Sequence, residues 1–346
     1  MLTRRGWAVA AVAAVAVAMA GWFGARSLNG VVAPAAVALA AGYVQLRRTP
    51  RPDLRVEAPE YGFAGDAAEV AVAFDTETPL AGAVELTARG PLALAGDSVE
   101  TTVTDEPIAF GLELSERGVG AVGPVELRVE DVFGLWTATH RYSIRRDVTV
   151  FPRRRRLTDA NELAALDRTL GIDGRDRFDQ LREYERGDSL RDVHWKTSAK
   201  RTDDLVVMEY EADDRRGRIE LLAEADPGRA DETAEAAASV AGYLLDAGVA
   251  VGLTLPSDRI EPGTGPAHRI AVYAALARLS AGTVVDSRRG NPDVAVEGFE
   301  GEAVRVAAAG RSVEFARLAG PPAEPAVSPG SERSGRAAVA DGGERR

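Results

Sequence analysis

The chain has 346 residues and a formal net charge of −11. Such an acidic balance argues against a general nucleic-acid-binding protein, because neutralising phosphates requires a surplus of lysine and arginine. The absence of cysteine excludes disulfide bonds, thiolate metal sites and cysteine nucleophiles, and three histidines far apart in sequence argue against a histidine-rich metal centre. We therefore expect neither a nucleic-acid partner nor a cofactor.

Positive charge is carried almost entirely by arginine, and the two lysines, Lys196 and Lys200, lie within one short stretch. An acidic surface with almost no lysine is typical of proteins from a salt-loaded cytoplasm, where net charge maintains solubility. A halophilic source is therefore one hypothesis. High-GC coding, which also depletes lysine, is the other.

Two apolar segments open the chain. Residues 6–25 contain no charged side chain and are long enough to cross a bilayer as one helix. Residues 31–46 form a second apolar run, with Pro34 near its start, where a helix tolerates proline. We expect residues 1–49 to form a transmembrane helical hairpin.

Basic residues flank this hairpin on both outer sides. Arg4 and Arg5 precede the first segment and Arg47 and Arg48 follow the second, whereas Arg26 alone lies between them. Because positive flanks stay in the cytoplasm, the soluble part should face the cytoplasm as a multi-pass cell-membrane protein. The alternative is a signal peptide cleaved near residues 18–20, after which the second segment would still lead the chain into the cytoplasm.

Residues 50–152 carry a pattern of short alternating strands separated by glycine, proline and aspartate. Period-two alternation over such lengths predicts an antiparallel β-sandwich-like domain. The clearest predicted strands are residues 69–74, 83–88, 125–132 and 141–151.

Residues 153–218 are interpreted as a linker followed by a charged module. The four arginines at 153–156 suit a solvated linker, with binding of anionic lipid or RNA as the alternative. Leucines at helical spacing and a terminal Gly171 predict a helix over residues 157–171.

Residues 219–320 alternate strands and helices, which predicts an α/β domain with a parallel, doubly wound sheet. The expected strands cover residues 218–226 and 249–257, the expected helices residues 232–248 and 267–279, and a late hairpin residues 303–318. Residues 321–346 are rich in proline, glycine, serine and charge and are predicted to be a disordered tail.

The module at residues 175–218 mixes acidic and basic side chains in nearly equal number among aromatic and aliphatic ones. Such a balance favours a lattice of ion pairs over a phosphate-binding surface. A turn at Gly187 and Asp188 should start a helix over residues 190–200, which aligns Asp192 with Lys196. We expect this lattice to fasten the helix to the first strand of the α/β domain.

This module resembles the hallmark block of the domain of unknown function 58 family, in the stretch "LREYERGDSLRDVHWKTSAKRTDDLVVMEYE" at residues 181–211. The positions that match the family pattern, with a structural or docking role expected of them, are Arg182, Tyr184, Gly187, Asp188, Arg191, Trp195, Lys196, Ser198, Ala199, Lys200 and Glu209.

A second stretch, "RGVGAVGPVELRVEDVFGLW" at residues 117–136, is similar to another block of the same family. The chain departs from that pattern at Val132, where proline is usual, and at Trp136, where phenylalanine is usual. The matching positions are Arg117, Gly118, Gly123, Pro124, Asp131, Gly134 and Leu135.

The resemblance implies two membrane spans, a β-rich segment and a domain similar to von Willebrand factor A. Members of the family are often encoded beside MoxR-type AAA ATPases, which makes such an ATPase the expected partner. No enzymatic activity is established for the family, so the resemblance implies architecture and context without a reaction.

Von Willebrand factor A domains often hold a divalent cation through Asp-x-Ser-x-Ser after their first strand. Here Asp226 stands at the aspartate position, but Gly228 and Ala230 replace both hydroxyl residues. A hard cation needs several oxygen ligands, so the sequence predicts a degenerate site without metal.

A nucleophilic site can also be assembled from the module, with Ser198 as nucleophile and His194 or Lys200 as base. His194 and Ser198 are four residues apart and can meet on one helical face, whereas Ser198 and Lys200 diverge. The leading hypothesis is a membrane-anchored scaffold that docks a protein partner and is not an enzyme. The alternative is a hydrolase or transferase that uses His194, Ser198 and neighbouring acids.

Overall fold

A computed structural model describes residues 1–23, 29–76, 78–159, 162, 164, 180–183, 206–209 and 217–322. The described chain forms two compact units, residues 1–150 and residues 151–323. The first contains the apolar helices and a pair of β-sheets, and the second contains a mixed α/β sheet.

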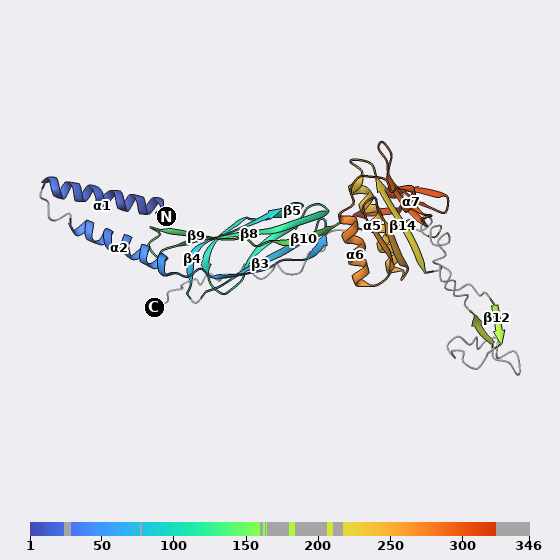
Figure 1. Ribbon diagram of the computed structural model, residues 1–346, viewed down its shortest axis with the longest axis horizontal. Helices are drawn as coiled ribbons and strands as arrows, with labels where there is room; N and C mark the ends of the chain where they lie inside the picture. Colours follow the sequence, from blue (N-terminus) through green and yellow to red (C-terminus); the bar gives the residue numbers. More distant parts are fainter. Residues whose placement is uncertain are drawn as a thin grey trace, which may run out of the picture. The chain divides into compact units, whose positions relative to one another are not determined.

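Two helices, α1 (Arg4–Phe23) and α2 (Asn29–Arg48), form from the two apolar segments, as predicted. Each has 20 residues and is therefore about 30 Å long, the thickness of a bilayer's hydrocarbon core. They pack against each other, and most of their side chains are exposed, including Val12, Val15 and Val37 (Figure 1). Both are long and apolar enough to cross a membrane.

The β-rich part of the first unit consists of a four-stranded antiparallel sheet and a six-stranded sheet. The four-stranded sheet has the order β1-β3-β7-β5, and the six-stranded sheet has the order β2-β10-β8-β4-β6 with β9 paired to β8. The strands are β1 (Asp53–Glu57), β2 (Tyr61–Phe63), β3 (Ala67–Asp75), β4 (Leu80–Arg89), β5 (Leu92–Leu94), β6 (Ser98–Val103), β7 (Ile108–Leu114), β8 (Gly118–Glu130), β9 (Thr137–Tyr142) and β10 (Arg146–Phe151).

The inward-facing side chains of both sheets form one apolar core. It includes Phe74 from β3, Phe110 from β7 and Leu127 from β8, each almost fully buried. Buried and exposed positions alternate along β3 and β7, which is the period-two pattern that predicted the strands. One expected strand was wrong: residues 141–151 contain the end of β9 and all of β10, separated by Ser143, Ile144 and Arg145.

The second unit has a six-stranded mixed sheet of order β16-β15-β14-β17-β18-β19. The central strands β15, β14 and β17 are parallel, and the outer strands pair antiparallel. Helices α5 (Ala230–Asp246) and α6 (Pro266–Ala277) pack next to each other on the sheet (Figure 1). The strands are β14 (Arg218–Ala225), β15 (Ala250–Thr254), β16 (Arg259–Gly263), β17 (Val294–Gly298), β18 (Arg305–Ala308) and β19 (Arg311–Glu314), with short helices α7 (Asp286–Arg289) and α8 (Phe315–Leu318).

A two-stranded ladder of β11 (Arg155–Leu157) and β20 (Ala319–Pro322) joins the two ends of this unit. It corrects the prediction of a solvated linker at residues 153–156. Arg155 donates its backbone N–H to Ser239 Oγ at 2.9 Å and its guanidinium is paired with Glu235 of α5. The arginines thus satisfy acidic side chains of the α/β unit.

Leu157 likewise belongs to a strand and not to the predicted helix, because its side chain is buried against the α/β unit while its backbone pairs with Ala319. Most of the predicted helix at residues 157–171 lies outside the described residues.

Candidate functional site: the loop between the helices and the sheets

Of the family motif at residues 181–211, the structure describes two short strands. Strands β12 (Gln180–Glu183) and β13 (Val206–Glu209) pair antiparallel, which sets Arg182 opposite Val207 and Gln180 opposite Glu209. The other motif positions lie outside the described residues, namely Tyr184, Gly187, Asp188, Arg191, Trp195, Lys196, Ser198, Ala199 and Lys200. The same holds for His194, so the ion-pair lattice and the nucleophile hypothesis stay predictions.

Asp226 follows β14, where the sequence analysis placed a degenerate metal site. Its Oδ2 accepts the backbone N–H of Glu300 at 2.9 Å. Arg229, one turn further, pairs with Glu232 at 3.0 Å and donates to the backbone carbonyl of Glu302. Within the part of the chain that the structure describes, no group of three or more acidic or histidine side chains gathers to hold a metal ion.

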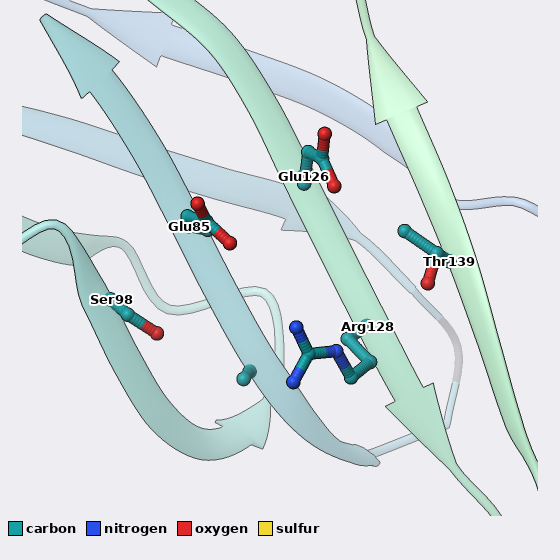
Figure 2. Close-up of a pocket in the computed structure, with 6 residues that line it drawn as sticks. Glu85, Ser98, Glu126, Arg128 and Thr139 are labelled. Carbon is teal, nitrogen blue, oxygen red and sulfur yellow. The ribbon is translucent and has the colours of Figure 1, made fainter.

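A small pocket lies on the six-stranded sheet of the first unit, lined by side chains of β4, β6, β8 and β9 (Figure 2). Glu85 and Glu126 are directly opposite each other across β4 and β8, with Arg128 beside them and Arg141 paired to Glu126 at 2.9 Å. Its cavity volume of about 10 Å³ holds roughly one water molecule. The arrangement is a charge cluster on a sheet surface, too small for a substrate.

The second family block, in contrast, forms a defined site. Arg117 precedes β8, Gly118 starts it, and Gly123 and Pro124 lie within it. Asp131, Gly134 and Leu135 lie in the loop that connects β8 to β9, residues 131–136. This connecting loop touches both apolar helices, so the block that the sequence singled out is the contact between the helices and the sheets.

Asp131 organises the connecting loop. Its side chain is 2% exposed, and its Oδ1 accepts the backbone N–H groups of Leu135 at 2.7 Å and Trp136 at 2.6 Å. Its Oδ2 accepts the N–H of Phe133 at 3.1 Å. Three amides directed at one carboxylate satisfy its charge without a cation.

The start of the chain is bound to this loop. The backbone N–H of Thr3 donates to Leu135 O at 2.9 Å, and Thr3 Oγ1 donates to Gly134 O at 2.6 Å. Leu2 forms a β-bridge with Trp136, and the amino group of Met1 donates to Thr137 O. The first residues before and within α1 are therefore part of the folded unit.

Helix α2 meets the loop on the other side. Trp136 donates its indole N–H to Leu39 O at 2.9 Å, and its ring lies 5.2 Å from the ring of Tyr43. Gln45 Oε1 accepts the backbone N–H of Val132 at 3.3 Å. The loop thus contacts α2 over its last turns.

Two glycines permit this close approach. A Cβ at Gly42 would lie 2.5 Å from Asp131 Oδ2 and 3.1 Å from Trp136 Cδ1, and a Cβ at Gly6 would overlap the carbonyl oxygen of Leu135. Any larger residue would displace the loop from the helices. Sequence reasoning missed this contact; its signal was a glycine near the outer end of each apolar helix, a common mark of close backbone approach.

The junction from α2 to β1 is also held by side chains. Arg51 lies over the ring of Tyr142, 4.3 Å from its centroid, and Tyr142 donates its hydroxyl to Pro52 O at 2.7 Å. Burial raises the pKa of Tyr142, while Arg51 acts in the opposite direction. Burial also lowers the pKa of nearby His140, and the charge of Arg51 adds to that effect.

Taken together, these contacts bind and orient the apolar helices against the sheets. The connecting loop offers backbone amides, a satisfied carboxylate and aromatic rings. These groups suit fixing a structure in place, since the carboxylate of Asp131 accepts three backbone N–H groups of its own loop.

Comparison with known proteins gives no assignment. No family model matches the chain, and no curated protein matches it. Among solved structures, the chain is 17% identical to native alpha-2-macroglobulin of E. coli, with a TM-score of 0.22 over 32% of this chain and 8% of that one. The trypsin-activated form of the E. coli protein is 14% identical, with a TM-score of 0.24 over 42% of this chain and 9% of that one.

A PKD domain of an M14-like peptidase from a Thermoplasmatales archaeon is 13% identical, with a TM-score of 0.18 over 28% of this chain and 97% of that domain. The chain thus spans less than a tenth of the length of the macroglobulins that it matches. Scores this low support no inference about shared fold or function.

Proposed function

We propose that this protein is a membrane-anchored scaffold that holds an α/β unit beside the bilayer for a protein partner. The observation that carries the proposal is the connecting loop, which fixes both apolar helices to the sheets through Asp131 and Trp136. Cleavage of a signal peptide would remove Thr3 and its hydrogen bonds to the loop. The contacts therefore favour two retained membrane spans over cleavage.

The scaffold role extends to the α/β unit. We propose a von Willebrand factor A-like domain of the domain of unknown function 58 family, supported by the two sequence blocks and by β14 at the centre of three parallel strands. The partner proposed from this resemblance is a MoxR-type AAA ATPase. In this arrangement the partner docks on the α/β unit and the charged module, on the cytoplasmic side.

Anchoring is tested by washing native membranes at alkaline pH and measuring the intact mass of the retained protein. We expect the protein to stay in the membrane pellet with residues 1–48 attached. Release into the wash, or a mass that lacks α1, would contradict the anchor.

Docking is tested by pull-down in mild detergent followed by mass spectrometry. The full chain is compared with a variant that lacks residues 151–323, because β11 and β20 belong to the same unit and must be removed together. We expect an AAA ATPase to be enriched only with the full chain. Equal recovery with both forms would place the docking surface on the first unit.

A further inference from the structure

Two apolar side chains of the connecting loop have no protein cover. Val132 is 78% exposed and Phe133 is 54% exposed. Among the described residues outside the first 48, no other large apolar side chain is as exposed as Val132. A rigid loop that presents a bare valine and phenylalanine side by side is unusual on a surface that faces only water.

The loop lies alongside the apolar part of α2. Its contacts are with Leu39, Gly42 and Gln45, all of which precede Arg47, the first charged residue at that end of the helix. Leu39 is eight residues before Arg47, or about 12 Å along the helix axis. If α2 crosses the bilayer, Trp136 therefore reaches past the level of Arg47. On the side of α1, the loop contacts Thr3 and Gly6, at the level of Arg4 and Arg5.

The surroundings of the loop fit the boundary between headgroups and acyl chains. The rings of Trp136 and Tyr43 pack against each other at a tilt of 56°, and the guanidinium of Arg47 lies 5.3 Å from the centroid of the Tyr43 ring. Tryptophan and tyrosine gather at this depth, with arginine reaching toward phosphates. Asp131 is compatible with such a site, because its carboxylate is buried and bound by three backbone amides.

We propose that the connecting loop inserts Val132 and Phe133 into the lipid surface beside the helices, as a third point of membrane contact. The inference rests on the proposed anchoring by α1 and α2. Its occupant is bilayer lipid, because the two exposed side chains belong to a loop that contacts α2 at Leu39 and Gln45, within the apolar part of that helix. A protein occupant would instead leave Phe133 open to water when the purified protein is in vesicles.

The natural absence of cysteine allows a single probe to be placed at will. The full-length variants Phe133→Cys, Val132→Cys, Val119→Cys and Val12→Cys are labelled with an environment-sensitive fluorophore and reconstituted into vesicles of phosphatidylcholine and phosphatidylglycerol in equal amounts. Quenching by lipids spin-labelled near the glycerol is compared with quenching by aqueous iodide, and the Val12 probe is also tested with lipids spin-labelled near the end of the acyl chain. Val119 is the water-exposed control: it is 41% exposed at the opposite end of β8, about 40 Å from the loop.

We expect the probes at residues 132 and 133 to be quenched several-fold more by the shallow lipid quencher than the probe at 119, and to be protected from iodide. The probe at Val12, in the middle of α1, reports anchoring itself. If the Val12 probe is quenched by lipid while those at 132 and 133 behave like the probe at 119, the loop does not insert and the anchor stands. If the Val12 probe also responds only to iodide, both proposals are wrong.

Discussion

Asp131 is a single side chain on which the whole connecting loop depends. Replacing it with alanine leaves the buried amide of Leu135 and the partly buried amides of Phe133 and Trp136 without their acceptor. We expect Asp131→Ala to lower the free energy of unfolding of the first unit by about 3 kcal/mol or more, since hydrogen bonds to a charged group contribute about 1.5 to 3 kcal/mol each. Asp131→Asn, which keeps one oxygen acceptor, should lower the free energy of unfolding by less.

The measurement is denaturant unfolding of the full chain in mild detergent. Asp75→Ala is the matched control, because the side chain of Asp75 is 64% exposed and pairs with exposed Arg55 at 3.3 Å. Such a pair contributes at most about 1 kcal/mol. An equal decrease in the free energy of unfolding for Asp131→Ala and Asp75→Ala would contradict the role of the buried carboxylate.

His140 gives the first unit a predictable response to acid. Its pKa is lowered by burial and by Arg51, so the folded protein favours the neutral ring. As the pH falls through the ordinary value of 6.5, the unfolded chain binds a proton first, and stability declines until the lower folded pKa is passed. We expect the melting temperature of His140→Gln to be higher than that of the parent protein below pH 6.5, and not to be higher above pH 6.5. A pH-independent difference would refute this.

The sequence around Asp226 makes a further residue-scale prediction. Gly228 and Ala230 supply no side-chain oxygen, and one oxygen of Asp226 is already bound by the amide of Glu300. A bound cation must raise the melting temperature. We expect magnesium, calcium and manganese to leave the melting temperature of the full chain unchanged. A rise with any of them that a chelator reverses would show a metal site.

At the scale of elements, the contact between α2 and the connecting loop depends on Gly42. Glycine to alanine normally stabilises a helix by up to about 1 kcal/mol. Because a Cβ at Gly42 would collide with Asp131, we expect Gly42→Ala to destabilise the first unit instead. Gly30→Ala in the same helix is the control, since no other group lies within 4 Å of its added Cβ. Thermal unfolding of both variants in detergent compares them; the same sign for both would overturn the prediction.

The elements that sequence predicted best are those with strong local patterns. The apolar segments predicted α1 and α2, and period-two alternation predicted β3, β4 and the second half of β8. The sequence did not predict β11 or β20, because an arginine run and an Ala-Gly-Pro-Pro stretch have little intrinsic strand preference. They form because they pair with each other, although they are far apart in the sequence.

In the candidate site, too, local sequence patterns were recognised and contacts between distant residues were not. Resemblance pointed to Asp131, Gly134 and Leu135 as a unit, and the structure places them in one loop. The hydrogen bonds of this loop to Thr3 and Leu39 join positions about a hundred or more residues apart, and no local pattern encodes such pairings. The depth of the loop along α2 could be recognised only from these contacts.

At the scale of the whole molecule, the distribution of arginine predicts which side of the membrane the soluble units occupy. Arg4, Arg5, Arg47 and Arg48 flank the two apolar helices on their outer ends. By the positive-inside rule, residues 50–346 should be cytoplasmic. We expect protease added to intact spheroplasts to leave them uncut and protease added after lysis to degrade them. Digestion in intact spheroplasts would reverse the assignment.

The bonds between Thr3 and residues 134–135 impose an order on biosynthesis. When α1 leaves the ribosome, its partner loop has not yet emerged, and about 110 residues separate the end of the helix at Phe23 from Gly134. At about 5 to 20 residues per second, this wait lasts on the order of ten seconds. During that interval the loop cannot hold the first helix, so the hydrophobicity of α1 and its packing against α2 must retain it until the loop has been synthesised.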